Sequence, residues 1–551
     1  MAVSTPDLPR LAHPAMRDQI SRVPYLPGLD GLRALAVIGV IVYHANHSWL
    51  GGGFLGVEVF FVISGYLITL LMVSEHERTG TVSLRSFWLR RARRLLPALY
   101  VMLALLAVYM TFFRRAPMGN TRGDFVGGLL YASNWVQIVI GQSYTAAEAF
   151  APLRHLWSLA VEEQFYLLWP LVMSLLLKRY GKRITRTAPM MFLASLFIAG
   201  CTAAMFIGGS VFLGADPTGA PSCGTAESHG FVSLFGHCIN VNEFLYLSTP
   251  TRLGGLMLGA AMALLWRPVA VMRGPLRNRG VQIDIAAAIG VAGMITLMVR
   301  RSLLDSASGS YDPWLFRGGF FLVGLCTLAA IAAATHRRTF TGRLLGMRPL
   351  RWVGTRSYGL YLYHWPVYQI VRHTGHQLSV GQFFLALAIA VPITELSYRF
   401  VELPIREGRY RAGFTRRTRS VVRRRRRTLV ALVVAVGVTG FAAVNIATAD
   451  VLCVGQIECD SQRGQQAIAG DHSPVTMPSV ATSSTSSTST SSTVPASSIT
   501  VAPSTTENLT LHSPVYAIGE SVMLGAAPIL QAAGINVNAA VSRLTSADNS
   551  P

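Results

Sequence analysis

The sequence predicts an all-α polytopic membrane protein, with ten transmembrane helices and an eleventh that leads to a partial α/β fragment. The 551 residues are 51% hydrophobic and only 13% charged, and the mean hydropathy is +0.42. Many apolar runs approach the roughly 20 residues that cross a bilayer. Lysine and arginine give a net charge of +22 and gather between these runs, which favours cytoplasmic loops over nucleic-acid binding.

Loop charge sets the expected topology. The basic segments 85–94 and 178–186 are expected on the cytoplasmic side, so an even number of spans must separate them. The apolar segment 124–140 is interrupted by Asn134 and Gln137, and we therefore predict a re-entrant or interfacial helix there. The expected spans lie near residues 32–47, 54–75, 95–113, 156–178, 189–213, 247–266, 281–299, 318–336, 354–373, 380–402 and 428–449.

The same rule places the chain in the plasma (inner) membrane, with a cytoplasmic N-terminus and an extracytoplasmic C-terminus. We expect no cleavable signal peptide, because the first apolar run begins only near Leu32. Arg114, Arg115 and Arg122 fall outside in this topology and count mildly against it.

The cysteines agree with this orientation. Cys223 with Cys238, and Cys453 with Cys459, lie in polar segments on the expected outer side, where an oxidising compartment favours two disulfides. The spacing of Cys and His residues is not typical of a metal site, so we expect no metal.

The composition changes after Asp450. Residues 473–507 are rich in Ser, Thr, Pro and Val, which is typical of a flexible linker. Residues 514–551 have the pattern strand, turn, helix and strand of a soluble α/β domain, but are too few to fold alone. The expected domains are a disordered cytoplasmic tail (1–24), a membrane domain (25–405), a basic cytoplasmic loop (406–427), the eleventh helix (428–449), an extracytoplasmic Ser/Thr-rich linker (450–513) and the α/β fragment (514–551).

Two ionisable side chains stand on the first predicted span. Arg33 and His44 are eleven residues apart. That is about three helical turns, so they share one face and lie ~16 Å apart along the axis. Ionisable groups within the hydrocarbon layer usually mark a pathway or a reaction site. Because an imidazole suits proton abstraction from an alcohol near neutral pH, we consider His44, with Arg33, a candidate catalytic residue.

An arginine cluster opens the third span from its expected inner side. Anchoring by positive charge on the cytoplasmic side explains such a cluster. Guanidinium groups at the start of a helix also suit phosphate, through bidentate hydrogen bonds and the helix dipole. Both interpretations stay open for Arg90, Arg91, Arg93 and Arg94, which are the candidate cofactor-binding residues.

Two stripes of polar side chains recur at helical spacing. His155, Ser158 and Glu162 lie on one face of an apolar helix, which is typical of a structural hydrogen-bond network or of a lined cavity. Tyr361 and His364 form a second stripe, which could equally neutralise buried charge.

Two serines are further candidates. Ser64 lies in the middle of the second span, where a small residue also allows close helix packing. Ser521 follows a predicted strand and precedes a helix, as a hydrolase nucleophile does, although serine is also a good helix N-cap. No Asp-x-x-His follows Ser521, so this serine lacks an activating base.

Five sequence blocks carry a family resemblance over residues 25–405. In order, YLPGLDGLRALAVIGVIVYHA, GVEVFFVISGYLIT, RARRLLPALY, HLWSLAVEEQFYLLWP and SYGLYLYHWP resemble the acyltransferase-3 family of integral membrane O-acyltransferases. The C-terminal part is similar to members whose eleventh helix leads to an extracytoplasmic SGNH hydrolase-like domain. Such domains usually begin with Gly-Asp-Ser, whereas this chain has Gly519-Glu520-Ser521 and lacks the later blocks. The resemblance therefore implies a truncated SGNH-like domain.

The family also implies an activity. An acyl group, typically acetyl, comes from cytoplasmic acyl-coenzyme A and is delivered to a hydroxyl on the other side of the membrane. By resemblance, Arg33 and His44 are essential, and Glu162 is the acidic position of the Trp-Ser-Leu-x-x-Glu block. The arginine-rich family motif corresponds to Arg90, Arg91, Arg93 and Arg94.

We therefore expect a membrane O-acyltransferase that O-acetylates a cell-surface glycan. Its expected partners are acyl-CoA (acetyl-CoA) as donor substrate, membrane lipid, and a polysaccharide or glycolipid acceptor, without nucleic acid or metal. The alternative is a proton-coupled membrane transporter of a lipid- or sugar-linked substrate, because buried His, Glu and Arg also build proton relays. We see no inverted repeat in the spans, which disfavours the transporter. A third hypothesis is a scaffold that acts through its Ser/Thr-rich tail.

Overall fold

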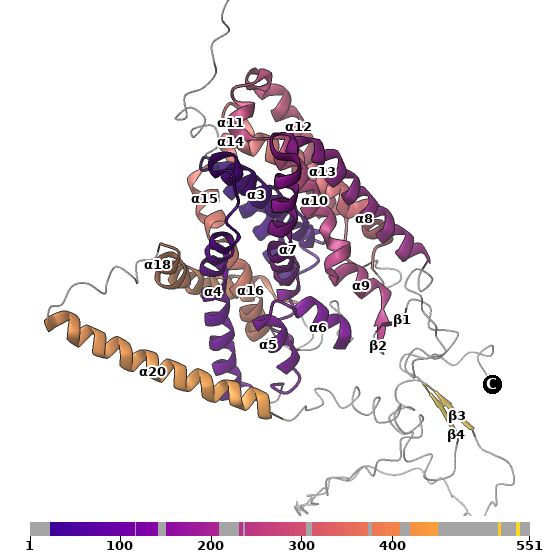
Figure 1. The fold of residues 1–551 in the computed structure, drawn as a ribbon. Helices are drawn as coiled ribbons and strands as arrows, with labels where there is room; N and C mark the ends of the chain where they lie inside the picture. Colours follow the sequence, from indigo (N-terminus) through magenta and orange to yellow (C-terminus); the bar gives the residue numbers. More distant parts are fainter. Residues whose placement is uncertain are drawn as a thin grey trace, which may run out of the picture. The chain divides into compact units, whose positions relative to one another are not determined.

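The computed structural model describes residues 23–115, 117–140, 150–208, 231–234, 237–304, 311–372, 377–407, 419–449, 516–519 and 536–539. The chain forms two compact units, Met1–Asp450 and Val451–Pro551, which are considered separately. Figure 1 shows the first unit as a bundle of long helices, as expected for an all-α membrane protein.

Ten helices of the first unit overlap the ten spans expected in the membrane domain. By length and composition, seven stretches of the described chain could cross a membrane, and one of them, Leu156–Ile207, contains two of these helices. The protein is therefore of the multi-pass type, whereas the exact number of spans stays a prediction. The ten helices are α2 (Pro27–Ala45), α3 (Gly56–Thr79), α4 (Leu84–Phe113), α7 (Leu156–Tyr180), α8 (Ala188–Gly208), α10 (Thr249–Leu265), α12 (Gly280–Arg300), α13 (Phe320–Thr335), α16 (Ser357–Val371) and α17 (Val380–Ser397).

Shorter elements join these helices. A hairpin of β1 (Phe231–Leu234) and β2 (His237–Asn240) is antiparallel, with Phe231 opposite Asn240. The expected eleventh span, residues 428–449, overlaps the second part of the long helix α20 (Arg419–Thr448), which packs against α4. The remaining elements are η1 (Gly53–Leu55), η2 (Gly181–Thr187), α9 (Val241–Leu247), α11 (Pro268–Val271), η4 (Pro275–Asn278), η5 (Leu315–Gly319), α14 (Phe340–Leu345), α15 (Arg348–Thr355), η6 (Tyr398–Glu402) and α18 (Leu403–Arg406).

Local sequence explains several helix ends. Pro27 occupies the first turn of α2, where the missing amide hydrogen is not needed. Helix α3 ends at Gly80, whose φ of 78° lies in the left-handed region that glycine adopts without strain. Helix α17 begins with a capping box, in which Ser379 Oγ accepts from the Gln382 amide and the Gln382 side chain accepts from the Ser379 amide.

The segment 124–140 does not form one helix. It lies in α5 (Arg122–Leu129) and α6 (Ser133–Ile140), which have eight residues each. An eight-residue helix is ~12 Å long, far shorter than the ~30 Å hydrocarbon core. The chain turns back between the two helices, where Tyr131 has a φ of 52°. Figure 1 shows α5 and α6 together beside the long helices, and this geometry agrees with the predicted re-entrant segment.

Polar contacts hold the turn between α5 and α6 against α7. The side-chain amide of Gln164, in the first half of α7, donates to the Tyr131 carbonyl and to Asn134 Oδ1, at 3.0 Å each. The indole of Trp135 donates to Gln164 Oε1 at 3.1 Å. Asn134 is fully buried and also donates to the Leu247 carbonyl. The polar residues that interrupt the apolar segment therefore bond to neighbouring elements.

Helix α2 packs closely against α14 and α15. A Cβ at Gly31 would lie 1.9 Å from the carbonyl oxygen of Leu345. A Cβ at Gly354 would lie 1.8 Å from the carbonyl oxygen of Asp30. Glycine is needed at both positions because the backbones of the three helices meet there. This packing fixes the first half of α2 and therefore the position of Arg33.

A buried ion pair joins α3 to α10. The carboxylate of Glu58 and the guanidinium of Arg252 are 3.1 Å apart, and each side chain is 3% exposed. The guanidinium also lies 3.8 Å from the centre of the Phe320 ring. A buried carboxylate needs such a partner because its desolvation is costly. The pair therefore helps to fix the register of α3 on α10.

The second unit contains one described sheet. Strand β3 (Tyr516–Gly519) pairs in parallel with β4 (Asn536–Ala539), which agrees with the two strands expected there. Ser521 lies outside the described residues, and so do Cys223, Cys453 and Cys459 of the predicted disulfides. The proposed SGNH-like character of this unit and the disulfides stay predictions.

Candidate active site

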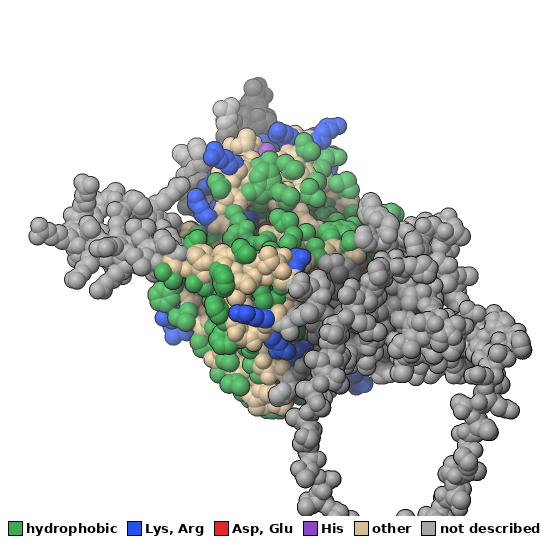
Figure 2. Space-filling view, turned by 90° about the horizontal axis from the view of Figure 1, so that it is seen from below, with side chains coloured by type: hydrophobic (Ala, Val, Ile, Leu, Met, Phe, Trp, Pro, Cys, Tyr) green, Lys and Arg blue, Asp and Glu red, His purple; other side chains and the backbone are tan. Residues whose placement is uncertain are grey.

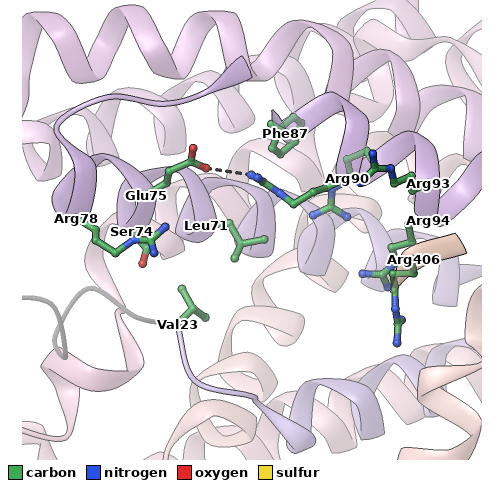
Figure 3. A pocket seen from close by; sticks show the side chains of 11 residues that line it. Val23, Leu71, Ser74, Glu75, Arg78, Phe87, Arg90, Arg93, Arg94 and Arg406 are labelled. Carbon is green, nitrogen blue, oxygen red and sulfur yellow. Dashed lines mark hydrogen bonds and ion pairs between the residues drawn. The ribbon is translucent and has the colours of Figure 1, made fainter. Parts of the chain in front are cut away.

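A basic cavity lies where α3 ends and α4 begins (Figure 3), and we call it the vestibule. Its volume is about 600 Å³. Of its eleven lining residues six are arginine, and Glu75 is the acidic one, 3.1 Å from Arg90. The lining residues are Val23, Leu71, Ser74, Glu75, Arg78, Phe87, Arg90, Arg91, Arg93, Arg94 and Arg406.

A second, narrower cavity lies next to the vestibule, inside the bundle. Arg91 and Arg94 line both spaces, so the two cavities are neighbours at these side chains. The inner cavity has a volume of about 60 Å³. Its walls come from α2, α3, α4, α7 and α16, at Arg33, Val57, Phe60, Phe61, Ser64, Arg91, Arg94, Leu95, Ser158, Leu159, Glu162, Tyr166, Ser357, Tyr358 and Tyr361.

Glu162 is the acidic side chain of the inner cavity. Ser64 Oγ donates to one oxygen of its carboxylate at 2.8 Å, and the Tyr166 hydroxyl donates to the other at 3.5 Å. The guanidinium of Arg91 lies 5.2 Å from the centre of the Tyr166 ring. Arg33 faces the same cavity from α2. The carboxylate therefore sits among cationic and hydroxyl groups that stabilise its charge.

His44 pairs with His364 of α16. His44 Nδ1 and His364 Nε2 are 2.8 Å apart, the ring centres are 5.1 Å apart, and the ring planes differ by 8°. Two rings with these values lie edge to edge in almost one plane, which aligns a ring N–H with the lone pair of the other ring. The indole of Trp365 packs against the His44 ring at 4.8 Å between centres.

The hydrogen bonds select a tautomer for both rings. His364 Nδ1 lies 3.0 Å from the Leu360 carbonyl oxygen, which can only accept, so this nitrogen carries the proton. His364 Nε2 then has a lone pair and accepts from the Nδ1–H of His44. A neutral His44 held in this way has its lone pair on Nε2, which is the basic and nucleophilic nitrogen of the ring.

Buried polar groups connect the inner cavity with this imidazole pair. Ser158 Oγ and the Tyr361 hydroxyl, which both line the cavity, are 2.6 Å apart. Both hydroxyls also lie within hydrogen-bond distance of the His155 carbonyl oxygen, Tyr361 at 2.9 Å and Ser158 at 3.4 Å. The Tyr361 and His155 rings lie 5.5 and 5.8 Å from the His364 ring. The rings of Tyr361 and His155 thus lie between the inner cavity and the His44–His364 pair.

The structure brings most of the predicted site residues together. Arg33, Ser64, Ser158, Glu162 and Tyr361 line the inner cavity, and His155 lies beside it. His44 and its partner His364 do not line that cavity, but the ring of Tyr361, which does, packs against the His364 ring. Of the arginine cluster, Arg91 and Arg94 reach the inner cavity, whereas Arg90 and Arg93 lie only in the vestibule.

Sequence reasoning missed part of the site. Arg406, at the end of α18, lies beside Arg94 in the vestibule (Figure 3). Its place just after the tenth expected span, on the expected cytoplasmic side, was a signal that could have found it. Arg78 has the same signal at the end of α3. No comparable signal connects Trp365 with His44, because that contact depends on how α2 and α16 pack.

The arrangement suits a ligand with phosphates at one end and a thin arm at the other. The vestibule offers guanidinium groups for phosphates, and the inner cavity is narrow and partly apolar. Coenzyme A is a ligand of this kind, with phosphates at one end and a thin arm at the other. Within the described residues, no group of three or more His, Cys, Asp or Glu side chains could hold a metal ion.

Comparisons with known proteins bear on the same region. Residues 26–399 match the family profile described as "Acyltransferase domain". The chain is 38% identical over 391 residues to O-acetyltransferase OatA of Staphylococcus aureus (strain NCTC 8325 / PS 47). It is 36% identical over 391 residues to peptidoglycan O-acetyltransferase OatA of Listeria monocytogenes serovar 1/2a (strain ATCC BAA-679 / EGD-e).

Both alignments cover 70% of this chain, and 58% and 56% of the respective relatives. The chain thus spans less than three fifths of the length of these curated relatives. No solved structure matches the chain.

Proposed function

The chain belongs to the acyltransferase family whose profile covers residues 26–399, and from this premise we propose that it is a membrane O-acetyltransferase of the cell wall. It takes the acetyl group from cytoplasmic acetyl-coenzyme A and transfers it to hydroxyls of peptidoglycan outside the membrane. The names of the relatives support the transferred group and the acceptor: both are O-acetyltransferases, and one is named for peptidoglycan.

One observation carries the proposal: a basic vestibule and an inner cavity adjoin at Arg91 and Arg94, and Tyr361, in the wall of the inner cavity, packs against the His44–His364 pair. The vestibule lies at the start of α2, and His44 lies at the end of the same helix. We assign the vestibule to the cytoplasm because the basic loops on either side of the re-entrant segment are expected there. The donor then enters from inside, and the acceptor approaches His44 from outside.

The arginines hold the donor. In this proposal Arg91 and Arg94, together with Arg406, bind the phosphates of coenzyme A by charge-assisted hydrogen bonds. The pantetheine arm passes between Arg33 and Glu162 into the inner cavity, and the thioester reaches the imidazole pair. The ~16 Å between Arg33 and His44 along α2 suits such an arm.

His44 acts as the general base. Its Nε2 takes the proton of the acceptor hydroxyl while the oxygen attacks the thioester carbonyl. A carbon–oxygen bond forms, the carbon–sulfur bond breaks, and the proton passes from His44 to the departing sulfur. The Tyr361 ring, 5.5 Å from the His364 ring between centres, helps to hold His364 in place.

Inverted membrane vesicles with radiolabelled acetyl-coenzyme A outside and a peptidoglycan fragment inside test this proposal. The unmodified protein is expected to label the enclosed glycan. His44→Ala is expected to lower the rate by at least ~100-fold, because the base is lost. Arg91→Gln with Arg94→Gln is expected to raise the KM for acetyl-coenzyme A by roughly tenfold or more, since two ionic hydrogen bonds are removed.

The matched control is Lys182→Gln with Arg183→Gln, which removes the same charge from exposed residues that line neither cavity. This variant should keep the KM of the unmodified protein. Full activity of His44→Ala would remove His44 from the reaction. If an acetyl group becomes attached to His44 when no acceptor is present, His44 is a covalent carrier of the acetyl group rather than a general base. Uptake of the substrate without any acetylated product would favour the transporter.

A further inference from the structure

A third cavity lies on the other side of the segment that leads into α2. Its volume is about 1020 Å³. Val23 lines the vestibule, whereas the next four residues, 24–27, line this cavity. The short segment 23–27, which we call the strap, therefore lies between the two spaces. We call this third cavity the side cavity. The other lining residues are Pro268, Val269, Met272, Arg273, Arg277, Ala334, Thr335, His336, Arg337, Arg338, Gly342, Arg343 and Gly346.

The side cavity is strongly basic. Five arginines line it, and no Asp or Glu is among the lining residues. None of the five forms a salt bridge in the described part of the chain. Arg338 donates to Asn278 Oδ1 at 2.7 Å, and Arg343 donates to the Thr339 carbonyl at 3.3 Å. Asp284 interacts electrostatically with Arg343 but does not line the cavity. The lining itself therefore carries a positive charge, which attracts anions.

Apolar groups accompany this charge. Leu26, Val269 and Met272 contribute apolar walls. Large hydrophobic side chains are also exposed on the neighbouring elements η4 and α14, where Leu276 is 41% and Phe340 64% exposed. Exposed apolar side chains of this kind are typical of sites that contact a partner or a membrane. The combination of an arginine-lined cavity and nearby exposed apolar side chains is that of basic pockets for lipid headgroups.

We propose that the side cavity binds a phosphate-bearing anion, supplied by the headgroup of an anionic phospholipid of the inner leaflet. The arginines bind the phosphodiester, and the acyl chains lie along the exposed apolar side chains of η4 and α14. This site is separate from the donor path and does not depend on the proposed acetyl transfer. Because residues 24–27 of the strap line it, a bound headgroup also stabilises the start of α2, the helix of Arg33 and His44.

Native mass spectrometry of the full chain in nanodiscs tests the site. Nanodiscs of phosphatidylcholine with phosphatidylglycerol are compared with nanodiscs of phosphatidylcholine alone. The test variant combines Arg273→Gln, Arg277→Gln and Arg337→Gln. We expect it to retain phosphatidylglycerol between ~10- and ~100-fold more weakly than the unmodified protein, because each arginine near a charged headgroup contributes a several-fold factor.

The matched control combines Lys182→Gln, Arg183→Gln and Arg186→Gln, which removes the same charge from exposed residues of η2, outside the side cavity. It should retain phosphatidylglycerol as the unmodified protein does. Equal loss in both triple variants, or no loss in either, would overturn the proposal, since general positive charge would then explain lipid retention.

Inorganic pyrophosphate is the soluble probe that separates the two sources of phosphate. Suppose that the unmodified protein binds pyrophosphate, that the cavity variant does not, and that neither prefers phosphatidylglycerol. The side cavity would then be an anion site for a soluble phosphate ester, and the assignment to a phospholipid headgroup would be wrong. Monodisperse elution of both triple variants checks that they fold.

Discussion

At the residue scale, the pairing of His44 with His364 decides which nitrogen of the candidate base is reactive. The Leu360 carbonyl fixes the proton on His364, and His364 in turn fixes the proton of His44 on Nδ1. In the proposed reaction His364 is therefore a positioning residue, which acts through His44 rather than on the substrate. Mutation of a partner that orients an imidazole in this way typically lowers activity by 10- to 100-fold.

This pairing gives a prediction for His364. His364→Leu removes the acceptor for His44 Nδ1–H, so we expect kcat to fall by roughly 10- to 100-fold. The KM for acetyl-coenzyme A should stay within about twofold, because His364 lies outside the vestibule. His364→Gln offers a carbonyl oxygen as acceptor and should recover part of kcat. Steady-state kinetics of the two variants measures both effects.

A purely structural role for His364 would give a different pattern. Both substitutions would then lower the amount of folded protein, and kcat per folded molecule would stay unchanged. A KM change as large as the kcat change would also contradict the positioning role, since it would mean that donor binding had been disturbed.

The sequence predicted which residues belong to the candidate site better than it predicted the contacts between them. Arg33 and His44 share a face of one helix, and Ser158 and Glu162 share a face of another, because helical periodicity follows from spacing alone. The bond between His44 and His364 joins residues 320 positions apart. Such a contact depends on how α2 and α16 pack, which spacing within one helix does not reveal.

At the element scale, the position of α2 depends on backbone contact with α14 and α15. A Cβ at Gly354 would lie 1.8 Å from the Asp30 carbonyl oxygen, a backbone atom that cannot rotate away. We therefore expect Gly354→Ala to lower stability by about 1–3 kcal/mol, the usual effect of overpacking. A lower midpoint of thermal unfolding in detergent, compared with the unmodified protein, checks this.

Gly200 provides the matched control. It lies inside α8, and a Cβ there would meet nothing within 4 Å. Gly200→Ala should be neutral or raise stability by up to about 1 kcal/mol, because alanine favours helix more than glycine does. An equal loss of stability in the two variants would show that glycine is not required by the contact between α2 and α15.

The re-entrant segment was predicted from the basic loops before and after it, which are both expected in the cytoplasm and so require an even number of spans between them. Its composition alone is as apolar as that of a short span. The structure divides it into two eight-residue helices. The turn at Tyr131, with its positive φ, was not predicted, because tyrosine is an uncommon residue in that conformation. Asn134 and Gln137 were noted as interruptions, but the carbonyls that they bond belong to Leu247 and Arg154, on other elements.

At the scale of the whole molecule, the surface is uneven in charge. The space-filling view from below shows hydrophobic side chains interrupted by a few Lys and Arg side chains (Figure 2). The bundle end that carries the vestibule and the side cavity has many more arginines around its cavities. This asymmetry is what the positive-inside rule expects for the cytoplasmic end. Arginines at the other end weaken the contrast, so orientation needs a direct measurement.

The orientation and the re-entrant segment can be tested together with two single cysteines. Arg85→Cys and Lys182→Cys are exposed and lie before and after the segment 124–140. If that segment returns to its own side, both cysteines face the cytoplasm, and a membrane-impermeant maleimide labels them only in inverted vesicles. If it crosses the membrane, the two positions lie on opposite sides and label in opposite preparations. Ser48→Cys, exposed just after α2, should label only in right-side-out vesicles. The native cysteines are replaced by serine in all three variants, so that each signal reports one position.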